Sequence, residues 1–270
     1  MSPTRIAAWA CLALALAALL APWIAPFDPD RTSLLARMRP PAPLSGYWAN
    51  LLGTDALGRD LLSRCLHGLR ASLGIAVFGS LIGAAAGTTI GLLAGTLRGR
   101  TDAALMLLVD VQLALPYLLI VLVGLAVFGT GIEVLIPLIS LAGWEYYARL
   151  VRGQVLVLRA QPFVEAARAT GASPARVMLR HVVPHLAPPL MAQFSLGVPH
   201  VMLLESSLSF LGIGVQPPTA TLGRMIGEAR HQMLAAWWTI AAPTATILAV
   251  TLVVQIAGNR FRQPGQHRAR

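Results

Sequence analysis

Six apolar stretches dominate this 270-residue chain and leave few ways for it to fold. A helix needs about 20 mainly apolar residues to cross roughly 30 Å of hydrocarbon, and inside hydrocarbon only helices and closed barrels satisfy every backbone polar group. Hydrophobic residues make up 56% of the chain and charged residues only 12%, which is typical of a membrane protein. We predict an all-α membrane protein with six transmembrane helices, near residues 6–27, 71–97, 103–128, 132–146, 186–211 and 237–258.

The first apolar stretch has two interpretations. It follows a single Arg5, so it resembles either a secretory signal or a first transmembrane helix. The 22 residues from Ile6 to Phe27 exceed a typical signal core and favour the helix. This interpretation places the N-terminus in the cytoplasm.

The charged residues exclude several functions. All 21 basic residues are arginine, so the chain has no P-loop lysine and no GxxxxGK[ST] motif for nucleotide binding. The net charge of +10 comes from arginines between the apolar stretches and at the termini, which argues against a nucleic-acid partner. The two cysteines form no metal-ligand spacing, and no HExxH or GxSxG motif indicates an enzyme. We therefore expect no catalytic residue, no metal site and no cofactor in this chain.

Three regions are expected along the chain. Residues 1–67 hold the first transmembrane helix and a polar segment outside the membrane, residues 68–260 form the transmembrane core, and residues 261–270 form a basic cytoplasmic tail. With both termini inside, the cytoplasmic parts carry 13 arginines and the outer parts 8, in agreement with the positive-inside rule. Asp55 and Asp60 in the outer segment are expected to cap a helix or form salt bridges.

Five glycines spaced four residues apart give the second transmembrane helix one smooth face. Small residues at this spacing let a neighbouring helix approach closely, so we predict a packing surface, with a role in a pore as the alternative. The glycines are Gly79, Gly83, Gly87, Gly91 and Gly95.

The segment 162–184 behaves like neither a membrane span nor a tail. Pro162–Thr170 has the residues of a helix, Gly171 ends it, and Ser173 with Pro174 begins another as a cap and a first-turn proline. Six arginines stand between residues 149 and 185 against the single acid Glu165, so this elbow is expected on the cytoplasmic side. The residues alone leave two interpretations open, a docking element and an ordinary basic loop.

The same segment resembles the EAA loop of ABC importer permeases, especially the C-type permease of the dipeptide, oligopeptide and nickel group. Three further runs resemble that group: LGTDALGRDLLSR (52–64), YARLVRG (147–153) and LSFLGIGVQPP (208–218). The resemblance implies the type I ABC importer transmembrane fold, with the loop as a coupling helix that seats in a groove of the ATPase subunit. The coupling residues that it implies are Glu165, Ala166, Ala167, Gly171, Ala172, Ser173, His181 and Pro184.

The resemblance also implies an assembly in the inner membrane. Its other members are a second, nonidentical permease, two ATPase subunits that bind ATP and Mg²⁺, and a periplasmic or lipid-anchored substrate-binding protein. Dipeptides or oligopeptides are the expected substrate, with nickel or a metal chelate as the alternative. A secondary transporter is a remote alternative, because the ionisable groups within the spans are single and scattered.

Polar residues within the fifth span suggest that part of it lines a water-filled path. His200 could ligate a metal, although hydrogen bonding is the commoner role of a single histidine in a helix bundle, and Asp110 in the third span is expected to hydrogen-bond within the protein. The segment 212–236 corresponds to the family's outer gate, but Leu222 stands where the group commonly has Trp and Asn259 where it has Asp. The residues assigned to the path or gate are His200, Glu205, Ser206 and Ser209.

Overall fold

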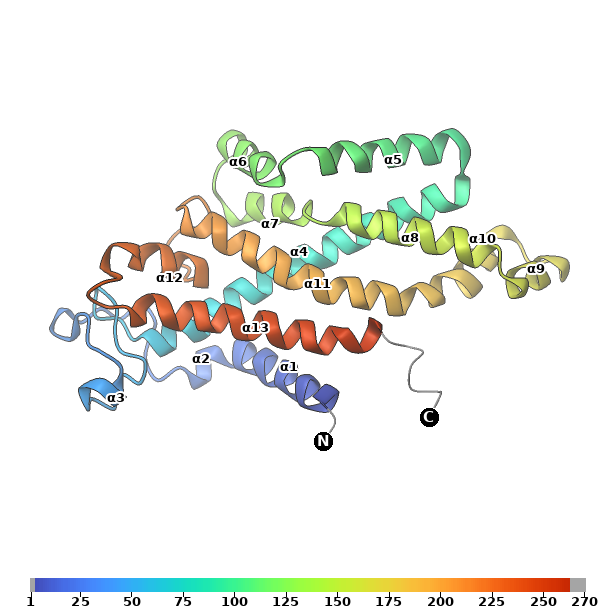
Figure 1. The fold of residues 1–270 in the computed structure, drawn as a ribbon. Helices are drawn as coiled ribbons and strands as arrows, with labels where there is room; N and C mark the ends of the chain where they lie inside the picture. The colour runs from blue at the N-terminus through green and yellow to red at the C-terminus, as the bar shows by residue number, and fades with distance from the viewer. Residues whose placement is uncertain (1–2, 263–270) are drawn as a thin grey trace.

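The computed structural model describes residues 3–262, with the side chains of residues 9–259, and every regular element among them is helical. The longest helices run side by side in an elongated bundle (Figure 1). A hydrophobic core forms where α4, α7, α11 and α13 meet. Most of the expected basic tail, residues 263–270, lies outside the described part.

The helices differ widely in length, and most are joined by short turns. In chain order they are α1 (Pro3–Leu19), α2 (Ala21–Ile24), α3 (Ala42–Ser45), α4 (Leu61–Leu97), α5 (Gly99–Ala114), α6 (Tyr117–Phe128), α7 (Ile132–Ser140), α8 (Trp144–Arg159), α9 (Pro162–Ala169), α10 (Pro174–Val177), α11 (Val183–Phe210), α12 (Leu222–Ala229) and α13 (Trp238–Arg262), with short 3₁₀ turns at 34–36 and 230–232 and a π-helical turn at 178–182.

The prediction of six simple transmembrane helices is met only in part. Three helical stretches in the described residues are long and apolar enough to cross a membrane: 61–97, 132–159 and 238–259. The pair α5 and α6 would make a fourth, but it is bent by 87°. In α1 the described apolar part is short, and α11 has the length but carries prolines, His200 and Glu205, which lower its hydropathy.

The span expected at 103–128 is therefore broken into two helices, and Pro116 gives the reason. A proline clashes with a helical conformation of the residue before it, and Leu115 accordingly has an extended ψ of 135°. Helix α5 ends at Ala114, and α6 begins after the proline.

The span expected at 132–146 continues much further into α8. A short break at 141–143, with Gly143 at a φ of +88°, separates α7 from α8, which then runs to Arg159. Two of the three arginines of α8 pair with acids of α5: Arg149 Nη2 lies 2.5 Å from Asp110 Oδ1, and Arg152 Nε lies 2.5 Å from Asp102 Oδ1. The expected hydrogen-bonding role of Asp110 is confirmed.

The glycine face of α4 lies directly against α8. A Cβ atom added to Gly91 would lie 2.5 Å from the Ala148 carbonyl oxygen, and one added to Gly95 would lie 2.8 Å from Val155 Cγ1. All five glycines of the stripe are buried: Gly87, Gly91 and Gly95 pack against α8, whereas Gly79 and Gly83 pack against the end of α7 and the break that follows it.

The second helix of the elbow and the fifth span, expected from the sequence as separate elements, form one continuous helix, which we call the rod. The second helix of the elbow continues through the π-helical turn into α11, so the helical path runs from Pro174 to Phe210 without interruption. At 1.5 Å per residue this rod is roughly 55 Å long. Pro188, Pro189 and Pro199 lie inside it.

Two adjacent tryptophans at the start of α13 differ in environment. Trp237 is exposed, whereas Trp238 is buried and its Nε1 donates to the Thr54 carbonyl oxygen at 3.3 Å. Trp238 therefore joins α13 to the outer segment.

Candidate functional site

The elbow projects from one end of the bundle, opposite the end that carries α3 and α12 (Figure 1). Helix α9 and the start of the rod are joined by Gly171, whose φ of +83° is a conformation that other residues rarely adopt. The Ser173 hydroxyl accepts from the Arg176 backbone N–H at 3.3 Å and caps the second helix. The expected helix, glycine and helix arrangement is confirmed.

A small apolar core fixes the elbow to the bundle. Val164 of α9 and Val177 of α10 are buried against Val151 and Val155 of α8 and Leu186 of α11. The elbow is therefore packed against both α8 and the rod, so that a displacement of one requires a displacement of the others.

Most of the residues assigned to coupling are exposed on the elbow. Glu165, Ala166, Gly171, Ser173 and Pro184 are exposed, whereas Ala167, Ala172 and His181 are half-buried. The small side chains leave the backbone accessible to a partner. The exposed arginines beside them are Arg168, Arg176 and Arg180.

A further contact ties the elbow end of α8 to α4. Arg159 Nη1 donates to the carbonyl oxygens of Gly95 at 2.9 Å and Thr96 at 2.7 Å. These carbonyls belong to the last turn of α4, where a cation stabilises the helix. The sequence shows Arg159 only as one more cytoplasmic charge. Its contact with Gly95 could not be predicted, because the two residues are 64 positions apart.

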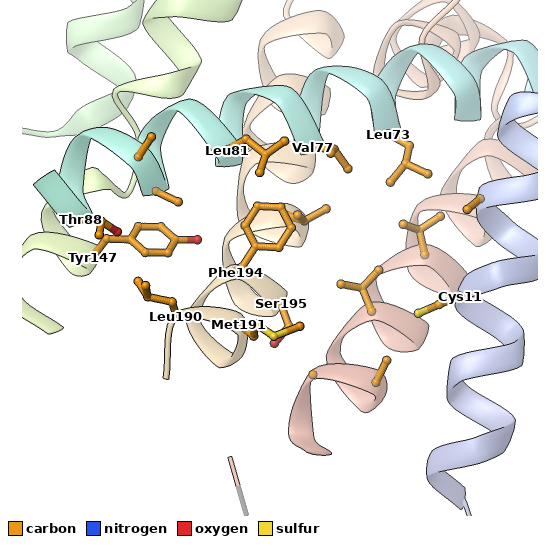
Figure 2. A pocket seen from close by; sticks show the side chains of 18 of the residues that line it. Cys11, Leu73, Val77, Leu81, Thr88, Tyr147, Leu190, Met191, Phe194 and Ser195 are labelled. Atoms are coloured by element: carbon orange, nitrogen blue, oxygen red, sulfur yellow. The ribbon is translucent and has the colours of Figure 1, made fainter. Parts of the chain in front are cut away.

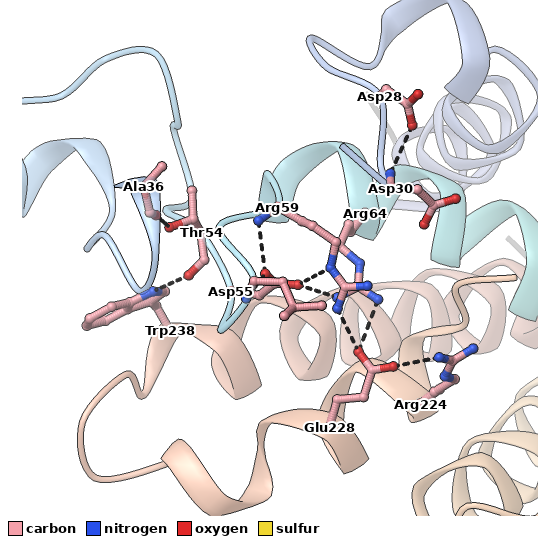
Figure 3. A network of polar contacts seen from close by, with 11 residues as sticks. Asp28, Asp30, Ala36, Thr54, Asp55, Arg59, Arg64, Arg224, Glu228 and Trp238 are labelled. Carbon is pink, nitrogen blue, oxygen red and sulfur yellow. Dashed lines mark hydrogen bonds and ion pairs between the residues drawn. The ribbon is translucent and has the colours of Figure 1, made fainter. Parts of the chain in front are cut away.

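At the opposite end, a network of charges joins the outer segment to α12 (Figure 3). Arg64, whose side chain is 4% exposed, bridges Asp55 Oδ2 at 2.5 Å and Glu228 Oε2 at 3.1 Å. Arg59 contacts the same two oxygens at 2.6 and 3.1 Å, and Arg224 Nη2 lies 2.8 Å from Glu228 Oε1. We call these five residues the outer latch.

The latch sets the ionisation of its two acids. Burial by itself would raise the pKa of Asp55, but the Arg59 backbone N–H and the guanidinium groups of Arg64 and Arg59 outweigh burial and lower it. Burial by itself would also raise the pKa of Glu228, but its three arginine neighbours outweigh burial and lower it. Both acids are therefore charged at neutral pH. Asp60 caps α4 by accepting from the Ser63 N–H at 2.8 Å, so the expected roles of Asp55 and Asp60 are confirmed.

A second polar cluster lies beneath α12 and is centred on Glu205, which is fully buried. Glu205 Oε2 accepts from Ser72 Oγ of α4 at 3.0 Å, and Oε1 accepts from Ser209 Oγ at 2.6 Å. Ser72 Oγ also accepts from the Leu222 N–H at 3.2 Å, so one carboxylate links α4, α11 and the start of α12.

Glycines bring α12 into direct contact with the rod. A Cβ atom on Gly223 would overlap the backbone of Ser206, and one on Gly227 would lie 2.9 Å from the Phe210 carbonyl oxygen. Helix α12 is therefore seated on the outer end of α11.

The structure brings together three of the four residues assigned to the path or gate. Glu205, Ser206 and Ser209 share the cluster beneath α12, whereas His200 lies on the exposed side of α11. Within the described residues, no three His, Cys, Asp or Glu side chains are grouped so that they could hold a metal ion.

An apolar groove of about 750 Å³ lies between α1, α4, α11 and α13 (Figure 2). Leu73, Val77 and Leu81 of α4 face Phe194 of α11 across it. Such a lining suits lipid chains or apolar helices and offers few groups to a polar substrate.

Comparisons with known proteins agree with this architecture. A family profile described as binding-protein-dependent transport system inner membrane component matches residues 87–263. The di/tripeptide transport system permease protein DppC of Pseudomonas aeruginosa is 39% identical over 252 residues, which cover 93% of this chain and 83% of that protein.

Two other relatives have similar coverage. The glutathione transport system permease protein GsiD of Escherichia coli is 38% identical over 92% of this chain and 81% of its own length. The probable D,D-dipeptide transport system permease protein DdpC of Escherichia coli is 34% identical over 90% of this chain and 80% of its own length.

Among solved structures, the inward-facing MetNI methionine ABC transporter has a similar fold. The match has a TM-score of 0.60 at 16% identity and covers 72% of this chain and 93% of that chain. At this identity the likeness concerns the fold alone.

Proposed function

We propose, because this chain belongs to the family of binding-protein-dependent transport system inner membrane components, that it is a permease subunit of an ATP-driven importer of dipeptides or oligopeptides. Membership makes it a multi-pass membrane component and not the ATPase. The peptide substrate is supported by relatives named for di/tripeptide, glutathione and D,D-dipeptide transport.

One observation carries the mechanism: a single helical rod joins the elbow to the outer gate region. ATPase subunits that close on ATP and Mg²⁺ would displace the exposed face of the elbow. Because Val164 of α9 shares an apolar core with Val177 and Leu186 of the rod, the displacement reaches Glu205 and α12 roughly 50 Å away. Movement of α12 would then open or close the path on the side of the binding protein.

The remaining members of the assembly are part of the same proposal. They are a second, nonidentical permease, two ATPase subunits and a periplasmic or lipid-anchored binding protein. The arginines of the elbow favour the cytoplasmic side for this end of the bundle, and both chain termini are assigned to the cytoplasm.

Co-purification and transport test the assembly. The tagged chain, extracted in mild detergent, should bring down a second permease and two ATPase subunits. In proteoliposomes with the binding protein, peptides and not Ni²⁺ should stimulate ATP hydrolysis and be taken up. A chain that purifies alone and transports without ATP would be a secondary transporter, and stimulation by Ni²⁺ alone would assign a metal substrate.

Substitutions in the elbow test the coupling role. Gly171→Val forces a β-branched residue into a left-handed conformation, and Glu165→Lys reverses the single acidic charge of the exposed face. Both should lower peptide uptake at least tenfold while leaving the amount of protein in the membrane unchanged. Gly171→Asn is the control, because asparagine tolerates this conformation. Normal uptake in the first two variants would contradict the coupling role.

A further inference from the structure

A second cavity, of about 350 Å³, lies between α4, α8 and α11. Its polar lining comes from Ser80 of α4, Tyr146 and Tyr147 of α8, and Gln193 and His200 of α11. Tyr147 also lines the apolar groove, so it lies between the two cavities. The break between α7 and α8 opens onto it at Gly143. Irregular backbone at membrane depth is tolerated where it lines a cavity or is buried in protein.

Two hydroxyl groups at this cavity have no hydrogen-bond partner. Ser80 and Tyr147 are only 2% and 3% exposed, and neither Ser80 Oγ nor Tyr147 Oη is paired with any group in the described part of the chain. Buried polar groups are nearly always hydrogen-bonded, so two orphans beside one cavity point to a bound molecule that supplies the partner.

Both hydroxyls converge on one position of α11. A Cβ atom added to Gly197 would lie 2.8 Å from Tyr147 Oη and 3.7 Å from Ser80 Oγ. Glycine keeps this position open, so the two hydroxyls and the α11 backbone meet without an intervening side chain.

The other polar groups lie on the accessible side of α11. Gln193 and His200 are seven residues apart, which places them two helical turns apart on the same face. Polar side chains on a membrane-spanning helix are costly toward lipid and therefore face protein or a water-filled path. This face of the rod is thus the side along which a polar molecule would pass.

The chemistry of the lining selects the ligand. Hydroxyl, amide and imidazole groups both donate and accept hydrogen bonds, and no carboxylate, arginine or lysine is among the described residues that line the cavity. Such a set matches neutral amide groups better than a phosphate or a metal ion. A volume near 350 Å³ falls at the lower end of the range for small-molecule sites.

We propose that this cavity is a transient binding site for the backbone amide groups of the peptide in transit, with Ser80, Tyr147, Gln193 and His200 as its hydrogen-bonding residues. The proposal rests on the proposed function and assigns the path of the substrate through this subunit. The partner permease would close the open side of the cavity.

Removal of the two hydroxyls is the first test. In proteoliposomes of the complete transporter with loaded binding protein, the double variant Tyr147→Phe with Ser80→Ala should lower dipeptide uptake per ATP hydrolysed about five- to tenfold. ATPase stimulation by the loaded binding protein should stay unchanged. The control, Thr251→Val, removes an unpaired buried hydroxyl of α13 outside the cavity and should have no effect on uptake. Unchanged uptake in the double variant, or an equal fall in the control, would overturn the proposal.

Filling the cavity is the second test and reads out size selectivity. Leu196 lines the cavity, so Leu196→Trp places a larger side chain there and reduces its volume. Leu203→Trp adds the same bulk two turns further along α11, outside the cavity. The first variant should lower tetrapeptide uptake relative to dipeptide uptake at least tenfold, and the second should leave this ratio unchanged. If Leu196→Trp lowered the uptake of both peptides equally in an intact, ATP-hydrolysing complex, the site would be wrong. The same would follow if both variants changed the ratio of tetrapeptide to dipeptide uptake equally.

The two proposals fail in different ways. If the wild-type transporter takes up no peptide, the proposed function is wrong. If wild-type uptake is normal and the cavity variants match it in rate and size selectivity, the permease assignment stands and only the peptide site is wrong.

Discussion

Arg64 is the residue that holds the outer latch together, because its buried guanidinium contacts Asp55 and Glu228 at once. Arg59 duplicates both contacts from a more exposed position, whereas Arg224 pairs with just one of the two acids, Glu228 of its own helix. Removing one partner of a buried ion pair leaves the other charge uncompensated, which costs far more than the loss of an exposed pair.

Arg64→Ala should therefore lower the free energy of unfolding by about 3 kcal/mol. Arg224→Ala, which breaks a pair within one helix turn, should cost under about 1 kcal/mol. Thermal unfolding of the detergent-solubilised complex measures both. A similar fall in the two variants would mean that burial of Arg64 does not decide the strength of the latch.

Acid should weaken the same latch. The pKa values of Asp55 and Glu228 are lower in the folded protein than their ordinary values of 3.8 and 4.5, so the unfolded chain binds more protons as the pH falls through this range. Stability is then complete above about pH 5 and is lost as the pH falls through the folded pKa values. The unfolding temperature should fall from pH 7 to pH 3.5, and it should fall less in Asp55→Asn with Glu228→Gln. An equal fall in this variant would assign the acid sensitivity to other groups.

At the scale of elements, the packing of α4 on α8 decides how the elbow reaches the rest of the bundle. At Gly87, Gly91 and Gly95 helix α4 presents no side chain to α8, and Arg159 fastens the end of α8 to the last turn of α4. Without a hydrophobic driving force in lipid, such close backbone contact is what holds neighbouring helices together.

Gly91→Val should separate these helices, since even its Cβ would lie 2.5 Å from the Ala148 carbonyl oxygen and the backbone has no free volume to yield. The variant should lose co-purification with the ATPase subunits and resistance to limited proteolysis. Gly74→Val on the same helix is the matched control, because a Cβ there meets no atom within 4 Å. Retained assembly in Gly91→Val would show that the stripe is not a packing surface.

At the scale of the whole molecule, the rod α10–α11 places the elbow and the Glu205 cluster at the two ends of one continuous helical element. Its accessible face carries Gln193, His200 and Ser207, whereas the exposed face of α6 carries only apolar side chains such as Val123. The bundle therefore has one side suited to a water-filled path and another suited to lipid.

Cysteine labelling in membranes distinguishes these two sides. In a chain with Cys11→Ser and Cys65→Ala, Ser207→Cys should react with a charged, water-soluble maleimide at least tenfold faster than Val123→Cys. Both positions are exposed in this subunit, so the difference measures water against lipid. Faster reaction at residue 123 would place the exposed face of α11 toward lipid and remove the path from this side.

The sequence by itself determined the features that depend on local chemistry: the apolar helices, the glycine face of α4, and the elbow with its break at Gly171 and its cap at Ser173. Helix propensity, capping and the left-handed freedom of glycine act within a few residues, so they can be predicted from the chain alone.

Only the tertiary structure decided which distant groups meet. Arg64 and Glu228 are 164 positions apart, and Ser72 and Glu205 are 133 apart, so no spacing rule relates them. Tertiary packing also made one rod of the elbow and the fifth span, although four prolines stand between residues 184 and 199. Judged locally, a proline inside a helix removes a backbone hydrogen bond and favours an end or a kink. Here the neighbouring helices hold the backbone in place and keep it helical.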